Sequence, residues 1–448
     1  MAIEDALAPW LGNQRWFAGK GQGLRDLAIV ADTRLVAGDP ELRHLIIAVT
    51  HGAGPDYYQI LVGLRRRLPE RLEYARIGPV ADGGDSKIAY DALHDADLTK
   101  PILAAIAAGA ALGALQMRKI EGATFATGLD SLVLTGEQSN TSLVFGEESI
   151  LKVFRRLSPG PNPDLEVSTA LHRLGSTQVA EPLGYIETSL EDVPTSLAIL
   201  SRYLRLASDG WSLAATSVRD LYASYDMRAA DVGGDFAGES HRLGCATAQI
   251  HADLAAAFGT DDLDAAAISE LTEKMFRKLD LASAAVPELA KHADMISESY
   301  AEFGKLTGPI PVQRVHGDYH LGQVLRTETG WVVLDFEGEP ATPLAQRRSL
   351  SPALRDVAGM LRSFDYAARH QLIGHPDQAA RSDLARDWVR RNAEAFCAGY
   401  AEAGGQDPAE NRVLLRALQL DKAVYEVLYE ARHRPSWLSI PLDSLAEF

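Results

Sequence analysis

One stretch near residue 320 restricts what this chain can fold into more than any other feature. It reads VHGDYHLGQVL over residues 315–325, and an apolar run then ends at Asp335-Phe-Glu, twelve residues after Gln323. Short strand candidates surround this loop within a region that is otherwise helical. The spacing predicts that three oxygen-bearing side chains, those of Asp318, Gln323 and Asp335, converge at one site.

These side-chain types match the requirements of phosphoryl transfer. A carboxylate must orient the acceptor hydroxyl and take its proton, and oxygen ligands must hold the Mg²⁺ that bridges the phosphates. The pattern therefore predicts Asp318 as the catalytic base, Gln323 and Asp335 as Mg²⁺ ligands, and ATP as the phosphate donor. In protein kinases the corresponding groups are the catalytic-loop Asp, its Asn and the DFG Asp. Gln323 stands where Asn is usual.

Other interpretations of the same residues stay open. His-Gly-Asp by itself also fits a surface turn, and Asp335 could simply end a strand. His316 and His320 are four residues apart and could bind a metal ion, but a loop containing Gly317 is a poor substitute for the helix that such a pair needs. We expect both histidines to brace the loop through hydrogen bonds.

The residues upstream of this loop supply the other groups that an ATP site needs. Lys152 alternates with apolar neighbours in a strand candidate and is predicted to contact the phosphates, with Glu166 as its partner. A solvent-facing lysine on an edge strand is the alternative. Backbone groups near Ser201 and Tyr203 are expected to contact adenine. A small, polar segment is predicted to cover the phosphates through Gln138, Ser139, Asn140, Thr141 and Ser142.

The order of elements indicates an α+β chain. Strands are predicted at residues 45–50 and 57–62, a hairpin at 143–145 and 150–154, and a further strand at 196–204. The Ala-rich stretch 101–116 is interpreted as one packed helix. After residue 207 the periodicity becomes helical, around 213–230, 240–258, 262–282 and 284–304.

Composition excludes several classes of partner. Asp and Glu outnumber Lys and Arg by 61 to 44, a formal charge of −17, so broad contact with a nucleic-acid backbone is not expected. No stretch is apolar for long enough to predict a membrane span, and the N-terminus does not have the pattern of a signal peptide. Two cysteines, Cys245 and Cys397, suit a reducing compartment, so we expect a cytoplasmic protein.

Across nearly its whole length the chain resembles the actinobacterial maltokinases and the related glucosamine kinases. The matching segments are residues 14–19, 135–142, 315–325, 335–340, 355–366 and 420–437. The resemblance implies a bilobal, protein-kinase-like fold of the aminoglycoside-phosphotransferase type. It would comprise an N-terminal cap subdomain (1–100), a β-rich N-lobe (101–205) and a mainly helical C-lobe (206–448). It also implies that ATP converts maltose to maltose 1-phosphate, which feeds α-glucan and glycogen synthesis.

The same resemblance places the sugar beside Asp318 and His320, against a helix spanning 420–437. Carboxylates suit sugar hydroxyls and aromatic faces suit ring C–H groups; this helix offers Tyr425, Glu426, Tyr429, Glu430 and Trp437. A core stripe of tyrosines with solvated glutamates is the alternative, and Arg432 and Arg434 could simply pair with those carboxylates. Maltose is favoured over glucosamine about two to one, because Lys422-Ala-Val-Tyr-Glu is similar to the maltokinase version of the helix.

Two further hypotheses remain. The acceptor could be a non-sugar molecule such as an aminoglycoside or choline, or the chain could be a pseudokinase that only binds ligands, for which Gln323 is the one departure to cite. Some maltokinases are joined to a trehalose-handling enzyme; here such a partner would be a separate chain.

Overall fold

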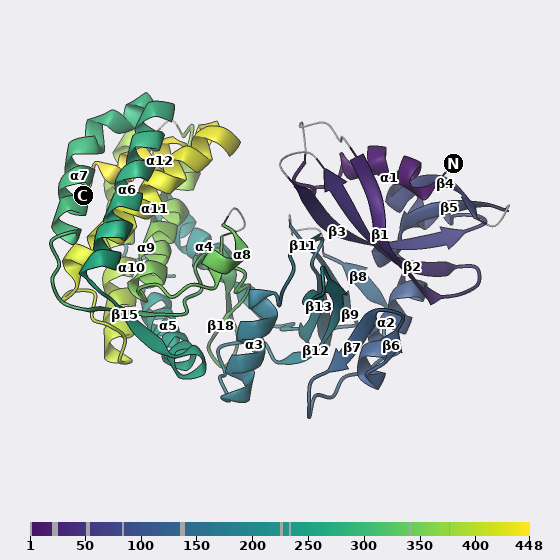
Figure 1. Cartoon of the computed structure of the whole chain (residues 1–448). Helices are drawn as coiled ribbons and strands as arrows, with labels where there is room; N and C mark the ends of the chain where they lie inside the picture. Colours follow the sequence, from purple (N-terminus) through teal and green to yellow (C-terminus); the bar gives the residue numbers. More distant parts are fainter. Residues whose placement is uncertain are drawn as a thin grey trace. The chain divides into compact units, whose positions relative to one another are not determined.

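The computed structural model describes residues 2–19, 26–50, 54–82, 85–134, 139–224, 227–232, 234–339, 342–375 and 377–448. The chain divides into two compact units. Unit 1 comprises Met1–Thr169 and Ala180–Arg205, and unit 2 comprises Ala170–Val179 and Leu206–Phe448. Unit 1 is built on two β-sheets, whereas unit 2 is mainly helical (Figure 1).

The first sheet of unit 1 has the strand order β1-β2-β3-β5-β4, and β11 joins it beside β3. Its strands are β1 (Asp26–Val36), β2 (Glu41–Thr50), β3 (Pro55–Arg65), β4 (Arg76–Asp82), β5 (Asp85–Asp91) and β11 (Arg156–Leu157). Helix α1 (Ile3–Leu11) packs on this sheet, because Leu7 and Leu11 share a core with Tyr58 and Val62. The strands predicted at 45–50 and 57–62 are confirmed within β2 and β3. The short 3-10 helix η1 (Glu70–Ala75) precedes β4, and the 3-10 helix η2 (Ala92–His94) follows β5.

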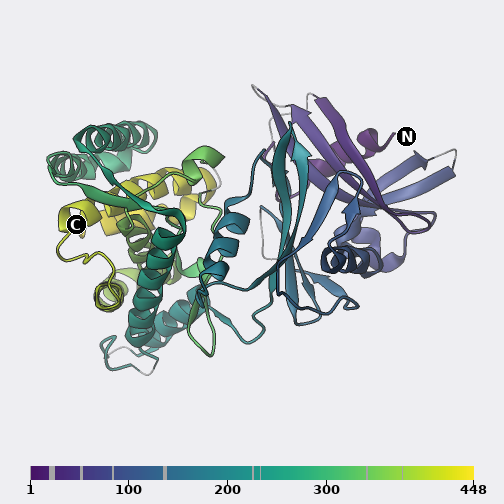
Figure 2. The same cartoon turned by 60° about the horizontal axis from the view of Figure 1, so that its bottom comes forward.

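The second sheet of unit 1 has the order β6-β7-β12-β13-β10-β9-β8. Its strands are among those coloured blue to teal in Figure 2. Its strands are β6 (Ala111–Leu112), β7 (Leu115–Lys119), β8 (Ser131–Val133), β9 (Thr141–Phe145), β10 (Ser149–Val153), β12 (Pro182–Leu190) and β13 (Val193–Arg202). The predicted hairpin is confirmed as β9 and β10, which place Ser142 opposite Lys152. The strand predicted at 196–204 is confirmed as far as Arg202, where β13 ends.

Helix α2 (Ala96–Ala108) corrects one prediction from the sequence. The stretch 101–116 is not a single helix, because α2 ends at Ala108 and the chain continues into β6 and β7. Asp95 begins the helix by accepting a hydrogen bond from the Asp97 N–H (3.3 Å). Gly109 ends it with φ +62°, a left-handed conformation that favours glycine and closes many helices.

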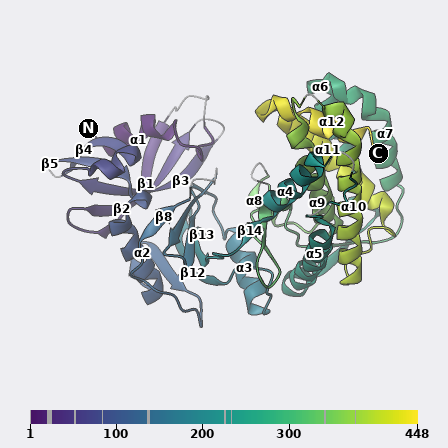
Figure 3. The same cartoon turned by 180° about the vertical axis from the view of Figure 1, so that it is seen from behind.

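Unit 2 contains most of the helices of the described residues. Their bounds are α4 (Gly210–Ala223), α5 (Ala237–Phe258), α6 (Ala265–Ala285), α7 (Ala293–Phe303), α8 (Leu344–Arg347), α9 (Leu354–Arg369), α10 (Gln378–Glu402), α11 (Arg412–His433) and α12 (Ser439–Leu445). Helix α3 (Pro163–Arg173) crosses the division between the units. Helix α9 packs against both α10 and α11 (Figure 3). Glycines allow α5 and α10 to touch: a Cβ on Gly244 would lie 2.1 Å from the Phe396 carbonyl oxygen.

Short strands interrupt the helices of unit 2 around the predicted catalytic loop. They are β14 (Ser208–Asp209), β15 (Thr260–Leu263), β16 (Ile310–Gln313), β17 (Val324–Arg326) and β18 (Trp331–Val333); β14, β17 and β18 form one sheet, and β15 pairs with β16. This arrangement anchors both ends of the loop. Among the described residues, no helix combines the length and the apolar character that crossing a bilayer requires.

Candidate active site

The loop between β16 and η4 (Leu321–Gln323) carries Asp318, and His316 braces it from within. His316 is buried, and its Nε2 donates to the Leu334 carbonyl oxygen (2.8 Å) while its Nδ1 accepts from the Asp318 N–H (3.3 Å). These two bonds join the segment of Asp318 to the segment that ends at Asp335. His320 accepts from the Gly322 N–H (3.0 Å). The hydrogen bonds show the bracing that the sequence predicted for both histidines.

A buried carboxylate on α9 holds the start of the same loop. Asp356 accepts from the N–H groups of His316 (2.7 Å) and Gly317 (2.9 Å), and His251 Nε2 on α5 donates to it as well (3.0 Å). Burial raises the pKa of Asp356, but the hydrogen bond and charge of His251 and the Gly317 amide outweigh it, so the pKa lies below its ordinary value. The ionised carboxylate therefore fixes two amides that immediately precede Asp318.

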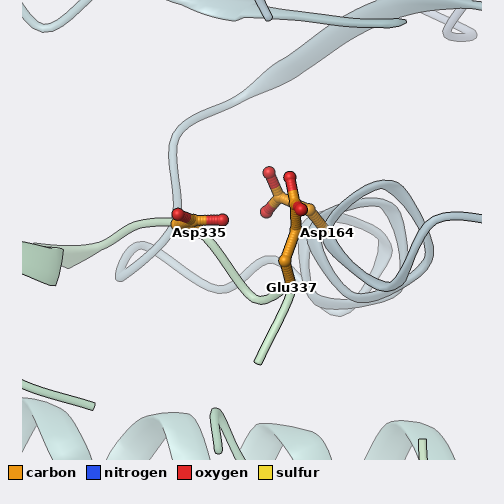
Figure 4. Close-up of side chains that lie close together, drawn as sticks. All are labelled: Asp164, Asp335 and Glu337. Atoms are coloured by element: carbon orange, nitrogen blue, oxygen red, sulfur yellow. The ribbon is translucent and has the colours of Figure 1, made fainter. Parts of the chain in front are cut away.

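Gln323 and Asp335 meet, as their spacing predicted. Gln323 Nε2 donates to Asp335 Oδ2 at 3.5 Å. One carboxylate oxygen of Asp335 and one of Glu337 lie within 4.8 Å of each other, and Figure 4 shows these two side chains. Asp335 adopts a left-handed backbone conformation (φ 61°), uncommon outside glycine and frequently found at functional sites. The oxygens of these side chains are the ligand type that Mg²⁺ prefers, and a half-turn of the Gln323 amide would present its carbonyl oxygen. The donor set thus fits Mg²⁺.

Lys422 on α11 contacts the predicted base and was not assigned a role from the sequence. Its Nζ donates to Glu339 Oε1 (2.7 Å) and to Asp318 Oδ1 (3.4 Å). Burial lowers the pKa of Lys422, but the charges of Asp318 and Glu339 more than offset it, so the pKa lies above its ordinary value and the amine stays protonated. About a quarter of each of the Lys422 and Asp318 side chains is exposed (24% and 25%), so a ligand can reach both.

Burial and the charges of the surrounding residues set the pKa of His320 on the same loop. Burial lowers the pKa of His320, and the charges of Asp318 and Asp335 act in the opposite direction. Lys422 also acts on the imidazole and adds to the lowering. Three of the charged side chains that define the site therefore all act on one histidine.

The acidic residues of α11 have arginine partners. Glu426 is buried, and its Oε2 accepts from Arg362 Nε (2.9 Å) and Nη2 (2.8 Å). Glu430 is also buried and accepts from Arg434 Nη2 (2.6 Å), as the alternative interpretation of the sequence anticipated. Burial raises the pKa of Glu426, although the charge of Arg362 opposes that shift. Both carboxylates of this helix face are therefore neutralised by arginines rather than held ready for a ligand.

Aromatic rings continue from Lys422 along α11. The Tyr425 and Tyr429 rings stack with centroids 6.1 Å apart, and Lys422 Nζ lies 5.0 Å from the Tyr425 ring centre. The helix predicted to reach residue 437 ends at His433, and Trp437 lies in the short 3-10 helix η6 (Pro435–Trp437). The Arg434 guanidinium lies 4.4 Å from the Trp437 ring centre. Tyr429 is 39% exposed, and its ring also stacks on that of His433, with the ring centroids 4.4 Å apart. Contact of Tyr425, Tyr429 and Trp437 with a sugar remains a prediction.

In unit 1, Lys152 lies on β10 and Asp164 begins α3. Lys152 Nζ donates to Asp164 Oδ2 at 3.1 Å, so Asp164 is a partner that the sequence analysis did not name. Glu166 lies on the same first turn of the helix, and its predicted role beside Lys152 remains a prediction. The Lys–carboxylate pair is the arrangement that a phosphate-contacting lysine needs.

The segment predicted to cover the phosphates is only partly described. Gln138 lies outside the described residues, Ser139 is exposed, and Asn140, Thr141 and Ser142 are buried at the start of β9. For the predicted adenine contact, Ser201 pairs with Ile150 in the sheet, and the Tyr203 N–H donates to the Glu148 carbonyl oxygen (2.9 Å). The roles of these residues in nucleotide binding stay predictions.

The two-sheet unit with a strand lysine, together with the loop that carries Asp318, Gln323 and Asp335, defines a phosphotransferase of the kinase type. Family models agree: residues 10–95 match the maltokinase N-terminal cap domain, and residues 133–414 match the phosphotransferase enzyme family. The chain belongs to the phosphotransferase enzyme family and carries the maltokinase cap domain. Its fold is α+β and kinase-like, as the sequence predicted.

The chain is similar to two glucosamine kinases. That of Streptacidiphilus jiangxiensis is 33% identical over 347 residues, which cover 75% of this chain and 76% of the relative. That of Mycolicibacterium smegmatis (strain ATCC 700084 / mc(2)155) is 31% identical over 315 residues, covering 69% and 77%. A solved glucosamine kinase in complex with glucosamine, ADP and inorganic phosphate covers 99% of this chain, with 98% of that chain covered, at 27% identity and a TM-score of 0.69.

Proposed function

We propose that this protein transfers the γ-phosphate of ATP to a hydroxyl of a small neutral sugar, with maltose as the acceptor and maltose 1-phosphate as the product. The observation that supports this proposal most strongly is the arrangement around Asp318. Its carboxylate is partly exposed, contacts the protonated Lys422, and sits on a loop that is tied to Asp335 through His316. A rigid, accessible carboxylate beside a charged hydrogen-bond donor can position a sugar hydroxyl and accept its proton.

Each side chain then has a distinct task. Asp318 takes the proton of the attacking hydroxyl, and Lys422 donates hydrogen bonds to the sugar and balances the charge of Asp318. Gln323 and Asp335, with Glu337 beside them, would hold Mg²⁺, which neutralises charge on the phosphates when it is bound. Lys152, paired with Asp164, contacts the phosphates of ATP. Backbone near Ser201 and Tyr203 binds adenine.

The charges near Asp318 favour a neutral acceptor over a cationic one. An amino sugar needs a carboxylate for its ammonium group, and the carboxylates of Glu426 and Glu430 already accept from Arg362 and Arg434. Beside Asp318, the amine of Lys422 is likewise already the partner of the carboxylates of Asp318 and Glu339. Maltose carries no charge and offers many hydroxyls.

Glucosamine is the second candidate, because both relatives at 31% and 33% identity are named glucosamine kinases. Binding of this amino sugar would require its ammonium group to share Asp318 or Glu339 with Lys422. The product would then be glucosamine 6-phosphate.

A panel of acceptors separates the candidates. The purified chain would be given Mg·ATP with maltose, glucosamine, glucose, choline or an aminoglycoside, and ADP release would be measured. We expect kcat/KM to be highest for maltose. If glucosamine is preferred, the proposed acceptor changes but the proposed reaction stands. If none of the five compounds supports ATP turnover, the proposed function is contradicted.

Replacing Lys422 by Met should raise KM for the sugar by about 10- to 100-fold, because a charged hydrogen-bond donor to the sugar is lost. KM for ATP should stay unchanged. Lys278→Met is the matched control, since Lys278 donates to Asp421 (2.6 Å), the residue next to Lys422 in the sequence, and is assigned no part in the site. Steady-state kinetics with each substrate varied in turn would measure both constants. An equal rise of the sugar KM in both variants would contradict a direct role of Lys422.

A further inference from the structure

The strand that carries Lys152 continues directly into the sheet of the cap. Residues 154–155 follow β10, and β11 then pairs with β3, with Arg156 opposite Tyr58. The Gln59 N–H donates to the Arg155 carbonyl oxygen (3.0 Å), and the Gln59 side chain donates to the Phe154 carbonyl oxygen (2.8 Å). The cap sheet therefore holds the backbone only two to three residues beyond Lys152.

Arg155 connects three parts of unit 1 through one buried guanidinium. Its Nη2 donates to Asp91 at the end of β5, and its Nε donates to Thr141 Oγ1 (2.8 Å) at the start of β9. Its guanidinium carbon lies 5.0 Å from the Trp16 ring centre in the N-terminal segment of the cap. The Arg155 side chain is 1% exposed, so these contacts are made away from water.

The location of the Thr141 contact matters because Thr141 belongs to the predicted phosphate-covering segment and begins β9. In the β9–β10 ladder, Thr141 lies opposite Val153 and Ser142 lies opposite Lys152. One guanidinium thus fastens the end of the covering segment to the strand of Lys152, and Asp91 and Trp16 fasten that guanidinium to the cap.

A buried ion pair is a weak means of stabilising a core. Replacing such a pair with apolar side chains is often neutral or stabilising, and the best-attested use of buried charge is to specify one geometry. The hydrogen bonds of Arg155 are directional, since a planar guanidinium fixes the positions of its acceptors. The cluster is therefore better suited to setting the register of β9 against β10 than to adding stability.

We propose that Arg155 is a positioning residue through which the cap sets the nucleotide-phosphate site of unit 1. Asp91 and Trp16 orient the guanidinium, which holds Thr141 and so places the start of β9, with Ser142, relative to Lys152. The cap is then a working part of the ATP site. This inference rests on the proposed function, because it takes Lys152 to be the lysine that contacts the phosphates of ATP.

The test measures the affinity of the full chain for Mg·ATP by titration calorimetry in the absence of sugar. Steady-state kinetics then give KM and kcat. Thr141→Val removes one hydroxyl from the cluster, and Asp91→Asn removes the charge that orients Arg155. We expect each change to weaken Mg·ATP binding by about tenfold, while KM for the sugar stays within about twofold of the wild-type value.

The double variant distinguishes positioning from direct phosphate contact. If Thr141 acts through Arg155, its substitution should have less than half of its effect in the Asp91→Asn background, because the two residues share one partner. If Thr141 itself binds phosphate, the two effects should simply multiply, and that result would overturn the proposal.

Tyr90→Phe is the matched control for a change in cap stability. Tyr90 also carries a buried hydroxyl in unit 1, which donates to Asp95 (2.7 Å) and accepts from Arg65 Nε (2.9 Å), within a cluster centred on Asp95 at the start of α2. We expect a lower melting temperature with unchanged affinity for Mg·ATP. An equal loss of affinity in Tyr90→Phe would attribute the effect to general loosening of the cap and would contradict the proposal.

Trp16→Leu provides a second route if Asp91→Asn does not fold, because it removes the contact of the cap with Arg155 and no charge. Its Mg·ATP affinity should fall about threefold or more; wild-type affinity would overturn the proposal. If ATP binding responds as expected but no sugar is phosphorylated, the proposed function fails and this inference stands. If sugars are phosphorylated but the substitutions leave the affinity for Mg·ATP unchanged, only this inference fails. A wild-type chain that binds no Mg·ATP would contradict both.

Discussion

Replacing Asp318 by Asn is expected to lower kcat by about 100- to 10,000-fold, the usual contribution of a general base. Asn keeps the size of the side chain and still accepts a hydrogen bond from Lys422, but it cannot take the proton of the attacking hydroxyl. Affinity for Mg·ATP should change little, because Asp318 is assigned to the acceptor rather than to the nucleotide. Single-turnover kinetics and Mg·ATP titration of the same preparation would measure the two quantities.

Two controls make this result specific. Asp264→Asn introduces the same chemical change in unit 2 at the N-cap of α6, where Asp264 accepts from the Ala267 N–H (2.8 Å), and should leave kcat unchanged. Thermal melting should show that Asp318→Asn is folded, because the side chain is partly exposed and contributes little to the core. Turnover near the wild-type level in Asp318→Asn would remove the proposed base and, with it, the main argument for phosphoryl transfer at this loop.

Much of the fold could be predicted because it depends on local patterns. The alternation of apolar residues around Lys152 and the polar turn before it predicted the β9–β10 hairpin, and both strands are present. The prediction of one helix over residues 101–116 was wrong, because its Ala-rich composition was given more weight than the turn signal of Gly109. Gly109 stops α2, and its left-handed backbone (φ 62°) was not anticipated from an Ala-rich sequence.

The catalytic loop could be predicted in part for the same reason. Gln323 and Asp335 are twelve residues apart, and the short β17–β18 hairpin between them brings their side chains to 3.5 Å. Lys422 and Asp356 could not be found in this way. They reach the loop from helices that begin 94 and 36 residues after Asp318, at Arg412 and Leu354, and such contacts depend on helix packing that no local spacing encodes.

The hydrogen-bond partner of Lys152 shows a smaller limit of prediction from the sequence. Glu166 was predicted as the partner of Lys152 and stays a prediction, whereas Asp164, which accepts a hydrogen bond from Lys152, was not anticipated. A position at the very start of α3, with its N–H bonded to Asn162 Oδ1 (2.8 Å), directs Asp164 toward β10. Candidates two residues apart on a helix point in different directions, so only the packed structure identifies the partner.

Asp356→Asn is expected to cost about 3–5 kcal/mol of unfolding free energy, because it breaks a buried charged hydrogen-bond network. The carboxylate accepts from two loop amides and from His251, whereas an amide side chain would turn its NH₂ group toward at least one of those donors. The loop that carries Asp318 would lose its anchor on α9. We therefore expect kcat to fall as well, even at temperatures where the variant is fully folded. Urea denaturation and kinetics would measure these effects, with Asp209→Asn at the N-cap of α4 as a control.

The same carboxylate gives the stability of the wild-type protein a defined pH dependence. Because the folded pKa of Asp356 lies below its ordinary value, the folded state favours the ionised form. Its contribution is fully present above the unfolded pKa of about 4 and is lost as the pH falls through the lower, folded pKa. Between about pH 5 and pH 3, the unfolding free energy of Asp356→Asn should therefore decline less steeply than that of the wild type. Parallel slopes in urea titrations over this range would show that Asp356 is not held ionised by its contacts, and the proposed electrostatic anchoring of the catalytic loop would fail.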